Sequence, residues 1–190
     1  MTRWLDPHPV TVSDDLRNFI GGYPLVAETL VRRGMATVDA ARAFLDPDAY
    51  TPAPPTDLPG LSQAVDRVME AIQRKERICV WGDFDVDGQT ATTLLVATLR
   101  DLGSDVIYHI PLRETESHGV KVPWLQKELE KEARLIVTCD TGIDACEAVN
   151  YANAHGVDVI ITDHHELPAT LPDAYAIVNS HLLPAGHPLE

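Results

Sequence analysis

Three aspartates at alternate positions form the most chemically suggestive stretch of the sequence. Asp83, Asp85 and Asp87 lie within CVWGDFDVDGQT (residues 79–90), directly after an apolar run. Carboxylates this close repel one another, and the stretch holds no lysine or arginine to balance their charge. Bound divalent cations would explain the crowding, because Asp85 and Asp87, two apart on a turn, could each face a different ion.

Two further stretches carry residue types that bind metals. Asp140 follows the apolar run RLIVTC, and the triplet Asp163-His164-His165 follows VDVIIT. Each cluster comes directly after a predicted strand, and the carboxyl ends of parallel strands lie along one edge of a sheet. We therefore expect the three clusters to meet in one crevice. Carboxylates plus imidazole suit Mn²⁺ or Mg²⁺, with Zn²⁺ or Fe²⁺ as alternatives.

The expected geometry favours two ions rather than one. Asp140, arriving from a neighbouring strand, could bridge the ions held by Asp85 and Asp87, and His164 would complete one coordination shell. Paired ions activate a water molecule and stabilise the leaving oxygen of a phosphoester. His165 would then contact a substrate phosphate or donate a proton.

Each cluster taken alone also has a structural explanation. An Asp-x-Asp pair is common in surface turns, an aspartate after a strand can cap a helix, and receiver-like domains also carry acids after strands. The Asp163-His164-His165 triplet has no use in a receiver-like domain, and the three clusters together favour a metal site. Asp83 and Asp163 are interpreted either as supports behind the ligands or as additional ligands.

Alternating apolar runs and helical patterns predict the elements that position these residues. The pattern predicts an α/β fold, a parallel β-sheet flanked by helices with right-handed crossovers. Strands are expected at 77–81, 105–110, 134–139 and 157–162, with a short fifth at 174–179, and helices at 61–72, 89–103, 122–133 and 143–155. The Lys- and Glu-rich segment 126–132 is interpreted as a solvated helix face.

The first sixty residues have a different character. Ser13 and Thr37 are expected helix caps, and Pro24 is expected in the first turn of a helix that ends before Gly34. Residues 47–60, PDAYTPAPPTDLPG, contain too many prolines for a regular element. We therefore expect two parts: a helical region with a proline-rich strap at 1–60, and the α/β domain at 61–190.

Composition limits the classes of function. The 190 residues are 45% hydrophobic, contain no apolar stretch near the ~20 residues that span a bilayer, and begin without a secretory signal pattern, which predicts the cytoplasm. The three cysteines are interpreted as reduced core residues. The net charge of −14 argues against a large basic surface for nucleic acid, although bound cations can reverse the field locally.

A polar loop follows the second predicted strand and reaches the same sheet edge. In IPLRETESHGV (110–120), Arg113 could reach a phosphate and His118 could line the cleft. These two residues, with His165, form the predicted contacts to a substrate phosphate.

The motifs VWGDFDVDG, VTCDTGI and VDVIITDHHELP, together with the loop IPLRETESHGV, resemble the DHH phosphoesterase family and, within it, the RecJ-like exonucleases. The resemblance covers nearly the whole chain. It implies a pair of Mn²⁺ ions, with Mg²⁺ as an alternative, held by Asp85, Asp87, Asp140 and His164, with His165 at the phosphate. The implied reaction is phosphodiester hydrolysis on single-stranded DNA from the 5′ end, in recombination and repair.

The chain also departs from this family. His118 stands where the family commonly has tyrosine, and RecJ-like proteins continue well beyond 190 residues with a further acidic ligand and an oligonucleotide-binding domain. We therefore expect an N-terminal piece, weak or inactive alone, whose partners are the C-terminal domains. The alternatives are a DHH enzyme acting on short oligonucleotides, cyclic dinucleotides or pyrophosphate, and a non-catalytic DNA-replication scaffold. The sequence leaves the oligomeric state open.

Overall fold

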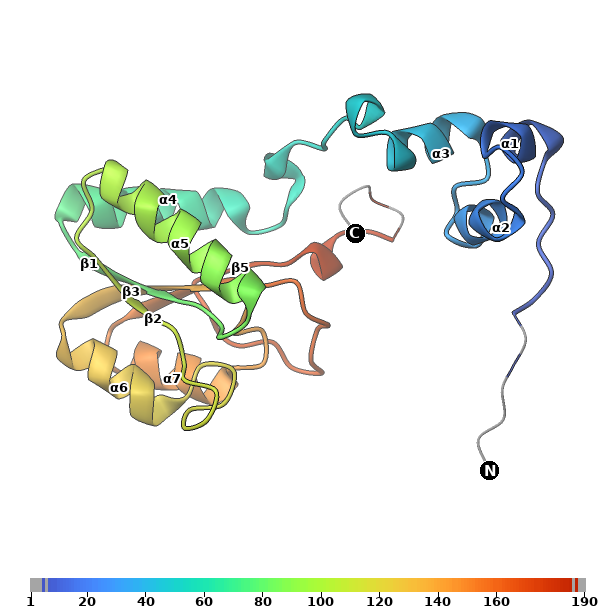
Figure 1. The fold of residues 1–190 in the computed structure, drawn as a ribbon. Helices are drawn as coiled ribbons and strands as arrows, with labels where there is room; N and C mark the ends of the chain where they lie inside the picture. Colours follow the sequence, from blue (N-terminus) through green and yellow to red (C-terminus); the bar gives the residue numbers. More distant parts are fainter. Residues whose placement is uncertain (1–4, 6, 186, 188–190) are drawn as a thin grey trace. The chain divides into compact units, whose positions relative to one another are not determined.

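The computed structural model describes residue 5, residues 7–185 and residue 187, and it contains two compact units, Met1–Pro52 and Ala53–Glu190. Each unit has a core of its own and is described by itself (Figure 1). Within the described residues, no helix combines the length and the apolar character needed to cross a membrane.

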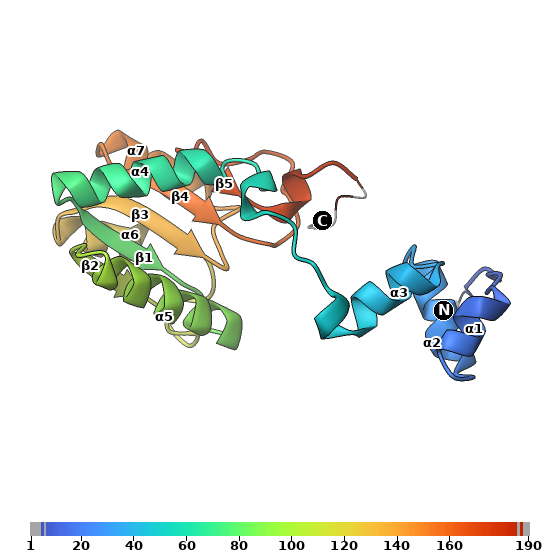
Figure 2. The ribbon, with the colours of Figure 1, turned by 90° about the horizontal axis from the view of Figure 1, so that it is seen from above.

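The larger unit is built on a five-stranded, fully parallel sheet. The strand order is β2-β1-β3-β4-β5, and the strands run in the same direction (Figure 2). Their bounds are β1 Arg77–Trp81, β2 Val106–His109, β3 Ala133–Cys139, β4 Asp158–Thr162 and β5 Ala176–Val178. The predicted α/β fold with a parallel sheet is confirmed, and all five strands lie within two residues of their predicted ends.

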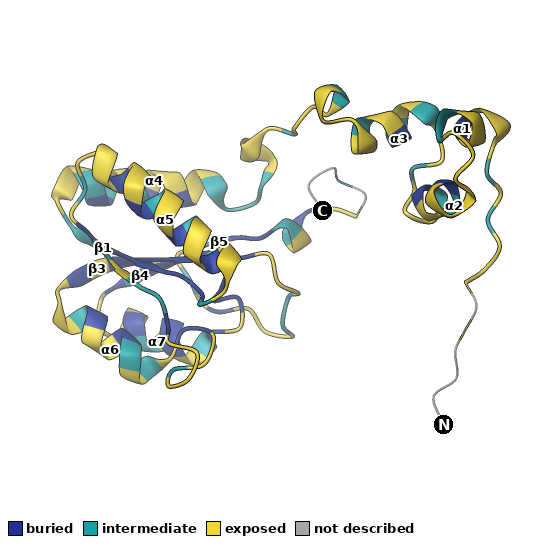
Figure 3. Cartoon of the chain, viewed as in Figure 1, coloured by how far each residue is buried: buried dark blue, intermediate teal, exposed yellow. Residues whose placement is uncertain are grey.

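Helices cover both faces of this sheet. α4 (Leu61–Arg74) and α5 (Val86–Asp101) lie on one face, and α6 (Val122–Glu130) and α7 (Cys146–Ala154) lie on the other (Figure 1). Successive strand residues alternate between the two cores, so that Ile78 packs with the first pair of helices and Cys79 with the second. Because both faces are covered, β1, β3 and β4 are buried almost throughout (Figure 3), whereas the edge strand β2 is only partly buried.

The strand order creates a switch point between β1 and β3. From β1 the chain crosses through α5 to β2 on one side, and from β2 it crosses back through α6 to β3 on the other side of β1. At such a point the loops after the two central strands diverge to opposite faces and leave a crevice at the carboxyl edge of the sheet. The loop after β1 carries Asp83 and Asp85, and the loop after β3 carries Asp140.

Two helix starts differ from the prediction. α5 begins at Val86 rather than residue 89, because Asp85 acts as its N-cap and accepts a hydrogen bond from the Gly88 amide. Gly88 therefore lies inside the helix, where a Cβ atom would come within 2.5 Å of the Asp83 nitrogen. α7 begins at Cys146 rather than residue 143, because the chain turns at Gly142 (φ +106°) before the helix can start.

The described residues of the smaller unit form three short α-helices, α1 (Asp14–Phe19), α2 (Pro24–Arg32) and α3 (Val38–Leu45). Ser13 and Thr37 cap α1 and α3 through their side-chain oxygens, and Pro24 occupies the first turn of α2, as predicted. Leu16, Leu30 and Ala41 form the buried centre of the unit.

The proline-rich segment contains two 3₁₀ turns, η1 (Pro47–Ala49) and η2 (Pro55–Asp57), which the sequence did not predict. The larger unit begins at Ala53, ahead of the boundary expected at residue 60. Its first residues belong there because Leu58 packs against the α4–α5 core, and Gly60 lies directly against the backbone of Ile177 in β5.

Candidate metal centre

Asp85 and Asp87 are placed by the start of α5 at the end of β1. The Asp85 side chain caps the helix by accepting the Gly88 N–H through Oδ1 at 2.9 Å. This hydrogen bond is the main reason why the pKa of Asp85 lies below its usual value. Asp87 lies in the first helical turn and is exposed. Both carboxylates lie at the positive end of the helix dipole.

Asp140 follows β3 in a left-handed backbone conformation (φ +63°). Its amide donates to the Thr162 carbonyl of β4 at 3.0 Å, so the residue is held between two strands. The Asp140 side chain is only 7% exposed. Burial, and then the charge of the nearby Asp85, raise the pKa of Asp140 above its usual value. The two carboxyl groups from β1 and β3 therefore face each other across the switch point.

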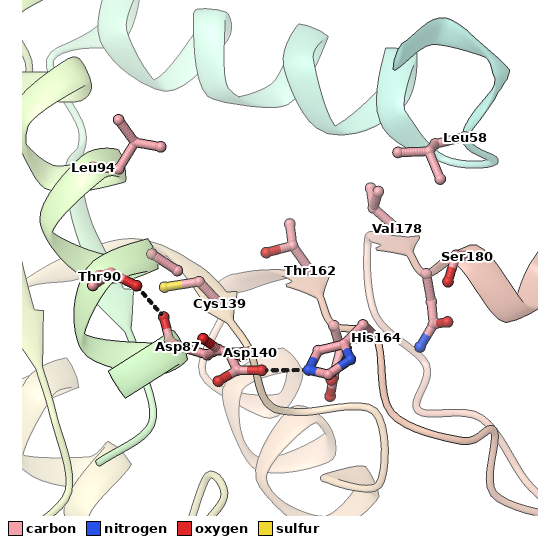
Figure 4. A pocket seen from close by; sticks show the side chains of 13 residues that line it. Leu58, Asp87, Thr90, Leu94, Cys139, Asp140, Thr162, His164, Val178 and Ser180 are labelled. Carbon is pink, nitrogen blue, oxygen red and sulfur yellow. Dashed lines mark hydrogen bonds and ion pairs between the residues drawn. The ribbon is translucent and has the colours of Figure 1, made fainter. Parts of the chain in front are cut away.

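The two histidines after β4 complete this group. His164 Nε2 lies 2.8 Å from Asp140 Oδ1 (Figure 4), and the His164 and His165 ring centroids are 4.6 Å apart. One possible ligand atom from each of Asp140, His164 and His165 lies within 4.8 Å of the others. Residues from three separate loops thus meet at one edge of the sheet, as the sequence predicted.

Asp163 holds His164 and His165 in place through hydrogen bonds. Its side chain is fully buried, and Oδ1 accepts hydrogen bonds from the His164 amide (2.7 Å), the His165 amide (3.1 Å) and His165 Nδ1 (2.7 Å). Its Oδ2 accepts the Ile143 amide at 2.9 Å. With both oxygens occupied, Asp163 acts as a support that fixes the His165 ring, and this hydrogen bond raises the pKa of His165.

Two cavities flank the group. One, of about 570 Å³, has Asp87, Asp140 and His164 in its wall, with apolar side chains opposite them, among them Leu58 and Leu94 (Figure 4). The second, of about 480 Å³, is lined by Asp83, Phe84, His118 and His165 among others. A ligand in either cavity would therefore contact one of the two adjacent histidines.

The predicted phosphate-binding residues lie around the second cavity. His118 is exposed and lines it together with His165, whereas the Arg113 guanidinium lies over the Phe84 ring, 5.0 Å from its centroid. Phe84 separates Asp83 from Asp85, so Arg113 contacts the acidic turn itself. Asp83 is buried, and its Oδ1 accepts the Phe84 amide at 2.7 Å, which favours a supporting role.

The donor set fits a hard divalent cation. Among the described residues, no lysine or arginine forms an ion pair with Asp85, Asp87 or Asp140. Two carboxylates that face each other in a partly buried site, beside an imidazole, match the ligands that Mn²⁺ and Mg²⁺ take in proteins. The centre as built lacks its own counter-charge, and cations of this type would supply it.

Sequence reasoning missed some supporting residues. Asn179, buried at the end of β5, donates from Nδ2 to the His165 carbonyl at 2.9 Å and lines the cavity that contains Asp140. The prediction of a solvated face at 126–132 is wrong for Glu128, which is buried and contacts His109 and Lys131. Glu128 has no local sequence signal, because its partner His109 is distant in the sequence. Asn179 could have been recognised as a site residue, because it is a polar residue directly after a strand at this edge.

A parallel sheet with an acid and imidazole cluster at its switch point defines a class of metal-binding α/β domain. The DHH family, N-terminal domain, matches residues 77–187, and the chain belongs to this family.

The chain is similar to curated exonucleases. It is 42% identical over 159 residues to the single-stranded-DNA-specific exonuclease RecJ of Bacillus subtilis, covering 82% of this chain and 20% of that protein. It spans about a fifth to a quarter of the length of the RecJ proteins it matches.

Solved RecJ structures have the same fold. Exonuclease RecJ bound to manganese matches with a TM-score of 0.67 at 37% identity, over 72% of this chain and 35% of that one. RecJ of Thermus thermophilus in complex with Mn²⁺ also matches with a TM-score of 0.67, at 31% identity, over 90% of this chain and 23% of that one.

Proposed function

We propose that this chain carries metal-binding and phosphate-binding residues of a RecJ-type exonuclease, which hydrolyses phosphodiester bonds of single-stranded DNA from the 5′ end. The proposed setting is recombination and repair in the cytoplasm. The observation that carries the proposal is the convergence of Asp85, Asp140 and His164 at the switch point of a DHH domain. Its similarity to single-stranded-DNA-specific exonucleases supports the choice of substrate.

In this proposal Asp85, Asp87, Asp140 and His164 hold two divalent cations, Mn²⁺ in the first instance and Mg²⁺ as the alternative. Bound cations of this kind polarise a phosphoryl oxygen and provide a nucleophilic water at neutral pH. The protein contributes the arrangement of the ligands: the α5 cap holds Asp85, and the β3–β4 hydrogen bond holds Asp140. Solved RecJ structures bound to manganese support the choice of metal.

The substrate phosphate is assigned to the side of the cavity that contains His165 and His118. Asp163 occupies Nδ1 of His165, so Nε2 is the ring nitrogen left to bind a phosphate oxygen. Arg113 is stacked on Phe84, which lines this cavity, and guanidinium pairs well with phosphate. Contacts to DNA far from the cleaved bond are assigned to C-terminal domains, because this chain carries a net charge of −14.

The test uses the protein at its natural length with single-stranded oligonucleotides labelled at either end. With Mn²⁺, we expect mononucleotides released from the 5′ end, little action on duplex DNA, and loss of activity in Asp140→Asn. The 190 residues alone should show little or no turnover. Cleavage confined to cyclic dinucleotides, short oligonucleotides or pyrophosphate would establish the alternative enzyme, and DNA binding without cleavage would establish a scaffold.

A further inference from the structure

A second cluster of charged side chains begins at the carboxyl end of β2, outside the candidate metal centre, and extends to Lys131, whose carbonyl accepts a hydrogen bond from Arg77 at the amino end of β1. His109 ends β2, and its Nε2 lies 2.7 Å from Glu116 Oε2 while its Nδ1 lies 3.3 Å from Glu128 Oε1. Lys131 Nζ donates to both oxygens of Glu128, at 2.9 and 2.8 Å. The Glu116 and Glu128 side chains are only 8% and 4% exposed. We call these four residues the His109 cluster.

The protonation state of His109 follows from its two partners. Each ring nitrogen faces a carboxylate, so only the imidazolium can donate to both. Burial by itself lowers the pKa of His109, but hydrogen bonds to Glu128 and Glu116 outweigh it and raise the pKa above its usual value. His109 therefore acts as the positive centre between two buried acids, where charge-assisted hydrogen bonds are strong.

The cluster lies against the strand that leads into the acidic turn. The His109 ring stacks on the Trp81 ring, with centroids 4.1 Å apart and an interplanar angle of 29°. Trp81 is the last residue of β1, and Asp83 follows two residues later. Glu128 comes from α6, so the cluster joins β1, β2 and α6 at one point.

Glu116 connects this point to the loop between β2 and α6, residues 110–121. The loop residues around Glu116 are exposed on both sides, so Glu116 is the buried side chain in the middle of a polar segment. Holding such a segment in one conformation costs about 1–2 kcal/mol per residue in backbone entropy. The same loop carries Arg113, which contacts Phe84, and His118, which lines the cavity with His165.

We infer that the Glu116–His109 ion pair is a positioning device, which holds the 110–121 loop against the sheet edge and so presents Arg113 and His118 to a substrate phosphate. This inference rests on the proposed function, because it assigns the loop to the phosphate of that substrate. Glu116 and His109 touch neither the metal ligands nor the substrate in this assignment. They act through the loop, so their loss should weaken substrate binding and leave the metal centre intact.

The test compares Glu116→Gln with Glu114→Gln in the protein at its natural length. Both substitutions remove one negative charge from the same loop, but Glu114 is exposed, whereas the Glu116 side chain is only 8% exposed and contacts His109. In Glu116→Gln we expect amide hydrogen exchange in 110–121 to rise about tenfold and KM for a single-stranded oligonucleotide to rise about tenfold. We expect kcat and calorimetric Mn²⁺ affinity to stay within about twofold of wild type. Glu114→Gln should leave all four quantities unchanged.

The outcomes separate the two proposals. If wild type cleaves the oligonucleotide and Glu116→Gln behaves like Glu114→Gln, the positioning role is wrong. It is also wrong if Mn²⁺ affinity falls as much as KM rises, because the cluster then supports the whole edge. If wild type does not cleave, the proposed function fails, and loop exchange alone decides whether the ion pair holds the loop. His109→Gln, which removes the other partner, should reproduce the pattern and serves if Glu116→Gln does not fold.

Discussion

Acidic side chains lie at both edges of the parallel sheet, but in opposite electrostatic settings. At the amino edge, Arg67 of α4 contacts Asp158 Oδ2 through Nε and Glu76 Oε2 through Nη2, both at 2.7 Å. Arg77 likewise contacts Asp105 at 2.8 Å. At the carboxyl edge, Asp85 and Asp140 face each other with imidazole as their nearest basic group.

This difference distinguishes acids that stabilise the fold from acids that bind a ligand. Charges paired with arginine at the amino edge join α4 to β4 and need nothing further. Acids that meet without a cation at the carboxyl edge carry a cost that a bound cation would remove, and such sites are typical of function. The charged groups that stabilise the fold and those that would bind a ligand thus lie at opposite ends of the strands.

The largest predicted effect is at Asp140. Asp140→Asn keeps the size of the side chain, and asparagine tolerates the left-handed backbone at φ +63°. We expect Mn²⁺ affinity to fall at least about 100-fold, because a bridging ligand is lost. In the absence of metal we expect thermal stability to rise by about 1 kcal/mol, since repulsion with Asp85 and the burial of a charge are both relieved.

Calorimetric Mn²⁺ titration and thermal unfolding in EDTA measure the two effects. Asp66→Asn on the exposed face of α4 is the matched control and should change neither quantity. Equal Mn²⁺ affinity in wild type and Asp140→Asn would show that Asp140 does not bridge the metal ions. If Asp140→Asn is less stable than wild type in EDTA, the charge of Asp140 is already compensated within the protein. The carboxyl edge would then not differ from the amino edge.

The opposite pattern is predicted at Arg67. Arg67→Met removes the cation that Asp158 and Glu76 share and leaves Glu76 only a 3.8 Å contact to Arg74, so the free energy of unfolding should fall by about 2 kcal/mol. This value is below that for a fully buried pair, because both acids are partly exposed. Arg74→Met removes an exposed arginine that pairs with Glu70 at 2.6 Å and with Glu76 at 3.8 Å, and it should cost under about 1 kcal/mol.

Urea denaturation measures these changes, and Mn²⁺ titration of the same variants tests their independence of the metal centre. Metal affinity should stay at the wild-type value in both, because Arg67 and Arg74 act at the far edge of the sheet. A drop in metal affinity in Arg67→Met would show that the two edges are coupled.

Much of this arrangement could be predicted from the sequence, because it follows from local patterns. Apolar runs fixed the strands, and the rule that parallel strands end at one edge brought Asp140 and His164 together. What could not be predicted depends on contacts between distant residues. Glu128 has the pattern of a surface helix residue, yet tertiary pairing with His109 buries it. Asp85 looked like a turn residue and is also a helix cap, because capping and metal binding use the same residue types.

His109 is an exception that sharpens the comparison, because it ends β2 at the carboxyl edge but its charge is paired, as charges are at the amino edge. Its charges give the smallest predicted effect, a pH dependence. Two charged groups contact the His109 ring, Glu116 and Glu128, and Lys131 in turn contacts Glu128. Because the folded pKa of His109 is raised, its contribution is complete below about pH 6.5 and is lost as pH rises through the folded pKa.

Glu128 has the opposite dependence. Burial raises its pKa, but hydrogen bonds to His109 and Lys131 outweigh burial and lower it. Its contribution is therefore present above about pH 4.3 and is lost as pH falls through the folded pKa. Between wild type and His109→Gln, the difference in unfolding free energy should be greatest in mildly acidic solution and should shrink, by about 1 kcal/mol, towards alkaline pH. Urea denaturation from pH 5 to 9 measures it, with His155→Gln as an exposed control. A pH-independent difference would mean that His109 packs as a neutral ring on Trp81, and pairing at this edge would then be no different from an apolar contact.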